Sequence, residues 1–126
     1  MGTEGYRSVS GTKVLLVQEI GTLTGELLNK LRAAGLSVTG VAESGSEALR
    51  LAGINPPDVV LIDTYLKGPM GPGDVASALT VQNPSLVAVI YLTFRESDVP
   101  GKPQHFILKP FSITELVRKI EQVLNM

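Results

Sequence analysis

Five short apolar runs alternate along the chain with longer segments in which apolar residues recur every three or four positions. The runs predict strands over residues 14–17, 37–41, 59–62, 87–92 and 105–108. The first, third and fourth runs are almost continuously apolar, which is typical of strands covered by helices on both faces. Strands that alternate with helical segments favour an α/β fold with a doubly wound, parallel sheet.

The segments between the runs carry signals for helices. Leucines recur at helical spacing over residues 23–31, and a further helix is expected over residues 74–81. Residues 44–47 and 112–115 each begin with Ser and end with Glu, the spacing of a capping box, so helices are predicted to start there. Three of these helices lie between predicted strands, as the crossovers of a parallel sheet require, and the fourth follows the last strand.

The segment between the fourth and fifth predicted strands is a poor helix. Pro100, Gly101 and Pro103 interrupt any helical run there, and few residues remain for a helix with its connections. We therefore expect the fourth helix of the sheet to be short or absent.

The size and composition of the chain fit one domain. It has 126 residues, of which 44% are hydrophobic, enough to bury a core. Residues 1–12 are small and polar and are predicted to be a disordered tail or a cloning remnant, which leaves residues 13–126 as the domain.

Charge and cysteine content narrow the function classes. Lys and Arg number 11 against 12 Asp and Glu, so no basic field favours direct binding to nucleic acid. No cysteine is present for disulfides or thiolate ligands. Apolar runs stay far below the roughly 20 residues of a spanning helix. No membrane partner is expected, and a cytoplasmic location is predicted.

Polar residues gather where the predicted strands end. Gln18 and Glu19 follow the first strand, Asp63 the third, Thr93 the fourth and Lys109 the fifth. Ligands of doubly wound sheets bind beyond the carboxyl ends of the strands. Each residue alone has an ordinary interpretation as a cap, a solvated charge or a neutralising partner. Together, at one edge of a sheet, they favour a functional site.

Four motifs at these positions carry a family resemblance. They are VLLVQE at 14–19, PDVVLID at 57–63, VIYLT at 89–93 and FILKPF at 106–111. Over residues 13–126 the chain resembles the receiver domains of two-component response regulators. The resemblance implies a flavodoxin-like fold with five parallel strands in the order 2-1-3-4-5.

The resemblance also implies a chemistry. Asp63 would accept a phosphoryl group from a histidine kinase or phosphotransfer protein, and Lys109 and Thr93 would contact that group. Mg²⁺ would be held by Glu19, Asp63 and the backbone carbonyl of Tyr65, with oxygen ligands of the kind it prefers. Such a domain is a signalling switch that modifies only itself, and not an enzyme with external turnover.

Further roles follow from the same resemblance. Thr93 and Phe106 occupy the positions of the family's switch pair, whose movement would change a surface read by an output protein or output domain. Pro110 follows Lys109 in a turn whose peptide bond is often cis in the family.

The chain departs from the family pattern at the site itself. Gln18 replaces an acid that usually reaches the metal through water, and one such charge is worth about 1 to 3 kcal/mol. We therefore expect Mg²⁺ to bind weakly, about tenfold to a hundredfold below a receiver with both acids. Phe94 and Tyr65 are bulky neighbours of the acceptor that either gate the phosphoryl group or pack sideways over the loops.

Two other interpretations remain open from the sequence. A degenerate receiver would keep Asp63 unmodified and act as a protein interaction module, with Gln18 as its first lost charge. A flavin or nucleotide domain of similar architecture is disfavoured, because no phosphate-cradling loop follows the first strand and the glycines of 68–73 have the wrong spacing. His105 begins a strand and is interpreted as structural.

Overall fold

The computed structural model of the protein describes residues 5–101 and 105–126. Its elements in chain order are β1 (Lys13–Val17), α1 (Thr24–Ala33), β2 (Ser37–Ala42), α2 (Gly45–Ile54), β3 (Val59–Asp63), α3 (Pro72–Gln82), β4 (Ala88–Thr93), the 3₁₀ turn η1 (Glu96–Asp98), β5 (His105–Leu108) and α4 (Ile113–Leu124). The five strands form one sheet in the order β2-β1-β3-β4-β5, and all pairs are parallel. The predicted fold and strand order are confirmed.

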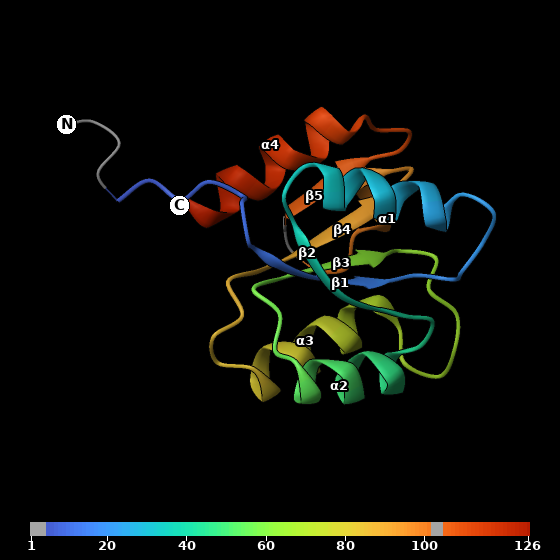
Figure 1. Ribbon diagram of the computed structural model, residues 1–126. Coiled ribbons are helices and arrows are strands. Elements are labelled where there is room, and N and C mark those ends of the chain that lie inside the picture. Colours follow the sequence, from blue (N-terminus) through green and yellow to red (C-terminus); the bar gives the residue numbers. More distant parts are fainter. Residues whose placement is uncertain (1–4, 102–104) are drawn as a thin grey trace.

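The sheet lies between two layers of helices, with α1 and α4 on one face and α2 and α3 on the other (Figure 1). Strand β1 shows how the sequence builds both layers. Val14 and Leu16 point to the core under α1 and α4, whereas Leu15 and Val17 point to the core over α2 and α3. All four are fully buried. Burying such a side chain stabilises the fold by about 1.5 to 3 kcal/mol, so the central strands fix the scaffold.

The two predicted capping boxes differ in detail. At α4 the box is complete, because Ser112 Oγ accepts from the Glu115 amide at 3.1 Å and Glu115 Oε1 accepts from the Ser112 amide at 3.0 Å. At α2, Ser44 Oγ accepts from the Glu47 amide at 3.2 Å, but the Glu47 carboxylate accepts from the amide of Glu43 instead. Both helices begin where the sequence predicts.

The amino-terminal segment is more ordered than the sequence indicates. Residues 1–4 lie outside the described part, but Val9 is buried against the core under α1 and α4, and Thr12 is also buried. The Gly11 amide donates to the Gly35 carbonyl at 2.8 Å, and the Tyr6 hydroxyl donates to Glu121 at 2.8 Å. These contacts make the segment from residue 6 part of the packed domain, in contrast to the predicted tail.

The connection between β4 and β5 contains only η1 in its described part. The expectation of a short or absent fourth helix is therefore confirmed; Pro103, one of the residues behind it, lies outside the described residues. Five strand ends differ from prediction by one residue. β1 begins at Lys13, β2 ends at Ala42 and β4 begins at Ala88. Asp63 and Thr93 are the last residues of β3 and β4 and do not follow them. His105 opens β5 as predicted, and its pKa is lowered by partial burial and by the charge of Lys119.

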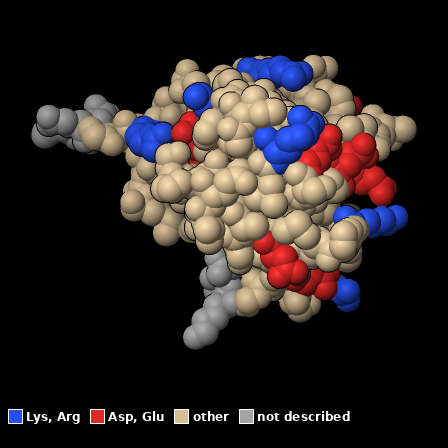
Figure 2. Space-filling view, turned by 90° about the horizontal axis from the view of Figure 1, so that it is seen from below, with Lys and Arg blue, Asp and Glu red and all other residues tan. Residues whose placement is uncertain are grey.

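The surface carries charges of both signs. On the face seen in Figure 2, Lys and Arg are interspersed with Asp and Glu around a broad uncharged area. None of the helices within residues 5–101 and 105–126 is long and apolar enough to cross a membrane.

Candidate functional site

The carboxyl ends of β1, β3, β4 and β5 bring most of the predicted polar residues to one edge of the sheet. Asp63 is the last residue of β3, and it pairs in register with Leu92 of β4. Val17 of β1 pairs with Ile62, which places Gln18 alongside Asp63 at the next position. The Lys109 amide donates to the Thr93 carbonyl at 2.7 Å, which ties the turn after β5 to the end of β4.

Asp63 and Lys109 form an ion pair through Asp63 Oδ2 and Lys109 Nζ. Their side chains are only 15% and 19% exposed, respectively. The other carboxylate oxygen of Asp63 accepts from the Tyr65 amide at 2.8 Å. A carboxylate this far from water is costly unless it is paired and hydrogen-bonded, and these two donors supply both conditions.

Thr93 is fully buried, and its hydroxyl group has partners within the protein. Thr93 Oγ1 donates to the Arg95 carbonyl at 2.8 Å and accepts from Thr64 Oγ1 at 2.9 Å. A hydroxyl group has one proton to donate, so Thr93 must leave Arg95 before it can donate to a phosphoryl oxygen. Thr64 belongs to none of the sequence motifs, and only its position directly after Asp63 could have indicated it.

Two aromatic rings lie beside the ion pair. The ring centroids of Tyr65 and Phe94 are 6.0 Å apart, and Lys109 Nζ lies 4.9 Å from the centroid of Phe94 and 6.0 Å from that of Tyr65. A cation at such distances is attracted by the ring faces. Both side chains are about half exposed, at 51% and 55%. The rings thus flank Lys109, and their gating role stays a prediction.

Glu19 lies apart from this cluster in its contacts. Its carboxylate pairs with Lys67 at 3.6 Å, and both side chains are largely exposed. The amide of the next residue, Ile20, donates to Glu43 Oε1 at 3.0 Å, which holds the loop after β1. An exposed pair contributes about 0 to 1 kcal/mol, so Glu19 can exchange Lys67 for another cation at little cost.

The oxygen donors at this edge fit Mg²⁺ in kind. Glu19 follows β1 and Asp63 ends the neighbouring β3. With the Tyr65 carbonyl they offer the one or two carboxylates and few further ligands that Mg²⁺ takes from a protein. Within residues 5–101 and 105–126, no three acidic or histidine side chains cluster as a ready metal cage. The metal-ligand roles of Glu19, Asp63 and Tyr65 therefore stay predictions.

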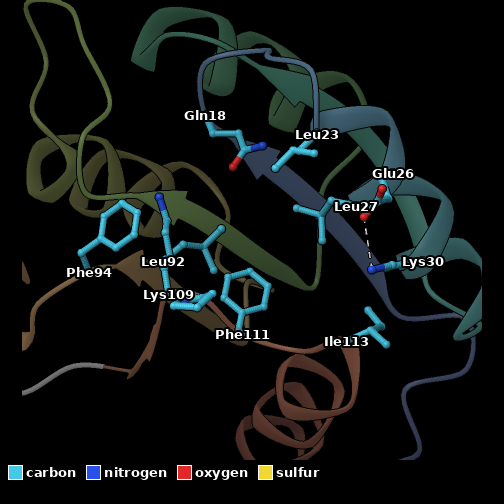
Figure 3. Close-up of a pocket in the computed structure, with 11 residues that line it drawn as sticks. Gln18, Leu23, Glu26, Leu27, Lys30, Leu92, Phe94, Lys109, Phe111 and Ile113 are labelled. Atoms are coloured by element: carbon cyan, nitrogen blue, oxygen red, sulfur yellow. Dashed lines mark ion pairs between the residues drawn. The ribbon is translucent and has the colours of Figure 1, made fainter.

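Gln18 lines a cavity of about 340 Å³ next to the ion pair. Figure 3 shows Phe94 and Lys109 on one side of this cavity and the ion pair of Glu26 and Lys30, 3.3 Å long, on the other. Leucines of α1 and residues after β5 supply its apolar walls. Gln18 therefore presents a neutral amide to an apolar space. In the family pattern this position holds an acid.

The predicted switch and turn residues lie close by. Phe106 is half-buried and pairs in register with Tyr91, two residues before Thr93, so Phe106 and Thr93 belong to the same face of the sheet. The peptide bond between Lys109 and Pro110 is cis. The switching roles of Thr93 and Phe106 stay predictions.

The fold and the polar residues at this edge indicate a receiver domain, and comparisons with known proteins support this class. No family model matches the chain. The transcriptional regulatory protein PdtaR of Mycobacterium tuberculosis is 29% identical over 115 residues, which cover 86% of this chain and 55% of PdtaR. The chain thus spans about half the length of the curated relatives it matches.

Solved structures support the same class. The signal receiver domain of a modulated diguanylate cyclase from Desulfovibrio desulfuricans G20 matches with a TM-score of 0.76 and 26% identity, covering 91% of this chain and 94% of that one. The PhyR receiver domain of Erythrobacter litoralis matches with a TM-score of 0.78 and 22% identity, covering 91% of each chain. The chain has the fold of these receiver domains, and the relatives and solved structures support a receiver domain of the response regulator class.

The ion pair of Asp63 and Lys109 should contribute to stability. We expect Lys109→Met to lower the free energy of unfolding by about 1 to 3 kcal/mol, because the Asp63 carboxylate loses a charged hydrogen-bond donor. Lys30→Met, which removes one partner of the exposed pair with Glu26, is the matched control and should cost less than about 1 kcal/mol. Urea unfolding of both variants measures the difference, and equal losses would contradict the assignment.

Proposed function

We propose that the protein is a phosphoryl-accepting receiver and that Asp63 takes the group from a histidine kinase or phosphotransfer protein. The observation that carries the proposal is the carboxylate of Asp63 at a strand end, held by Lys109 and the Tyr65 amide. An Asp63 oxygen attacks the phosphorus of a phosphohistidine. The new P–O bond forms as the P–N bond breaks, and the imidazole nitrogen keeps the electron pair and takes a proton from water.

Lys109 and Thr93 then hold the transferred group. The Lys109 ammonium exchanges its carboxylate partner for a phosphoryl oxygen, a role suited to a mobile point charge. Thr93 turns its hydroxyl proton from the Arg95 carbonyl to another phosphoryl oxygen. Phe94 and Tyr65, at the ion pair's side, screen the acyl phosphate from water.

Glu19, Asp63 and the backbone carbonyl of Tyr65 would hold Mg²⁺ at this edge. When bound there, the cation would supply the positive charge that lets two anions, a carboxylate and a phosphoryl group, approach one another. Gln18 contributes a neutral amide there in place of a second acid, so we propose weak metal binding.

The reaction makes the domain a switch. Thr93 moves toward the phosphoryl group, Phe106 follows into the space on the same face, and the changed surface is read by an output protein or output domain. The curated relatives, of which this chain spans about half, are named transcriptional regulatory proteins. Their names support an output domain or output protein that acts with this receiver. The switch modifies only itself, and we propose that it acts in the cytoplasm.

A second candidate is an interaction module that is never phosphorylated. It is favoured by Gln18, by the exposed position of the Glu19 carboxylate and by the two rings beside Lys109. Phosphorylation and this alternative make opposite predictions for one experiment.

Incubation with acetyl phosphate and Mg²⁺ should add the mass of one phosphoryl group to the intact protein. Mass spectrometry measures the gain, and Asp63→Asn, which cannot form the acyl phosphate, should show none. A wild-type protein that gains no mass would favour the interaction module.

In the same assay Phe94→Ala should shorten the lifetime of the adduct, because a screening ring is removed. An unchanged lifetime would contradict the screening role.

The amide at position 18 should weaken Mg²⁺ binding. We expect Gln18→Asp to raise the Mg²⁺ affinity about tenfold to a hundredfold, because it restores one negative charge beside the cation. Titration calorimetry or metal-induced NMR shifts measure the affinity. Gln82→Asp adds the same charge at the end of α3 and serves as the control; equal affinities in wild type and Gln18→Asp would refute the role of Gln18.

A further inference from the structure

A chain of hydrogen bonds joins the loop after β4 to the acceptor site. Asp98, in the η1 turn, accepts from the Tyr65 hydroxyl at 3.1 Å and from Arg95 Nε at 3.4 Å through the same oxygen, Oδ2. Its side chain is only 25% exposed. The Asp98 charge raises the pKa of the Arg95 guanidinium, with a smaller contribution from their hydrogen bond. One carboxylate therefore ties a loop to the residue two positions after Asp63.

The Arg95 carbonyl links this arrangement to Thr93. It accepts from Thr93 Oγ1 at 2.8 Å and from the Asp98 amide at 3.1 Å. The ring that Asp98 holds belongs to Tyr65, whose own amide donates to Asp63. Asp98 thus contacts Tyr65, whose amide donates to Asp63. It also bonds to the Arg95 carbonyl, which accepts the Thr93 hydroxyl proton.

We propose that Asp98 is a positioning residue of the phosphoryl site, which holds the Tyr65 ring beside Lys109 and keeps the η1 turn in place while Asp63 is unmodified. This inference rests on the proposed phosphorylation of Asp63. Asp98 does not touch the reacting atoms and acts through Tyr65 and Arg95. None of the sequence motifs includes it.

The arrangement opposes phosphorylation. When Thr93 donates to a phosphoryl oxygen, the Arg95 carbonyl loses one of its two donors, and the η1 turn is loosened. The Tyr65 ring, while fixed by Asp98, lies beside the ammonium that must receive the incoming group. In this proposal the bond between Tyr65 and Asp98 must break before the group can enter, so it raises the barrier to phosphorylation by its own free energy. Removing it should therefore speed phosphorylation and loosen the η1 turn.

Tyr65→Phe tests the proposal most cleanly, because it removes the hydroxyl group and keeps the ring and the net charge. The rate of Asp63 phosphorylation by acetyl phosphate should rise about threefold to tenfold, the effect of losing one net hydrogen bond. Asp98→Ala should raise the rate at least as much. Asp98→Asn keeps an oxygen acceptor for Tyr65 and should lie nearer to wild type than Asp98→Ala.

Glu96→Ala is the matched control for charge. Glu96 is exposed in the same turn, so its loss changes the attraction of an anionic donor without removing the contacts of Asp98. It should leave the rate within about twofold of wild type. The double variant Tyr65→Phe with Asp98→Ala should be no faster than Asp98→Ala alone, because both changes break the same bond.

Hydrogen exchange in the unphosphorylated protein separates this inference from the proposed function. The amides of Asp98 and Val99, which are bonded within the turn, should exchange faster in Tyr65→Phe than in wild type. Unchanged exchange would overturn the positioning role, whether or not Asp63 is phosphorylated. Faster exchange with an unchanged phosphorylation rate would also overturn it. Failure of wild type to gain phosphate would instead overturn the proposed function, while the exchange data still test the contact.

Discussion

The ion pair between Asp63 and Lys109 is the interaction on which the whole strand-end site depends. It joins the end of β3 to the turn after β5 and spans the end of β4, which lies between them in the sheet. The partly buried carboxylate would be costly without it, since water reaches little of the side chain. The same ammonium lies 4.9 Å from the ring centroid of Phe94 and 6.0 Å from that of Tyr65. Lys109 therefore sets both the charge and the shape of the site.

The other polar residues are held less tightly, and the difference has a functional meaning. The pair of Glu19 and Lys67 is exposed, so its net contribution is small and either partner can be exchanged. Thr93 donates its hydroxyl proton to the Arg95 carbonyl. Turning the proton elsewhere costs one ordinary hydrogen bond. A firmly held Asp63 surrounded by exchangeable partners is the arrangement that the proposed switch requires.

The architecture followed from the sequence because its signals are local or periodic. Continuous apolar runs predicted the central strands. The polar residues at the strand ends predicted that Asp63 and Lys109 lie close together. The contacts of the loops did not follow. Val9 is buried although its segment lacks periodicity, and the bonds of Thr64 and Asp98 depend on the path of a loop that only tertiary packing fixes. Side-chain partners across such loops carry no spacing that a single sequence reveals.

The most direct test of the central claim uses beryllofluoride, which imitates a phosphoryl group on a carboxylate. With Mg²⁺ present, ¹⁹F NMR of the wild-type protein should show bound resonances that are missing in Asp63→Asn. One of them should shift in folded Lys109→Met, because a fluorine loses its contact with the ammonium. A wild-type spectrum without bound fluorine, or a Lys109→Met spectrum identical to it, would contradict the account.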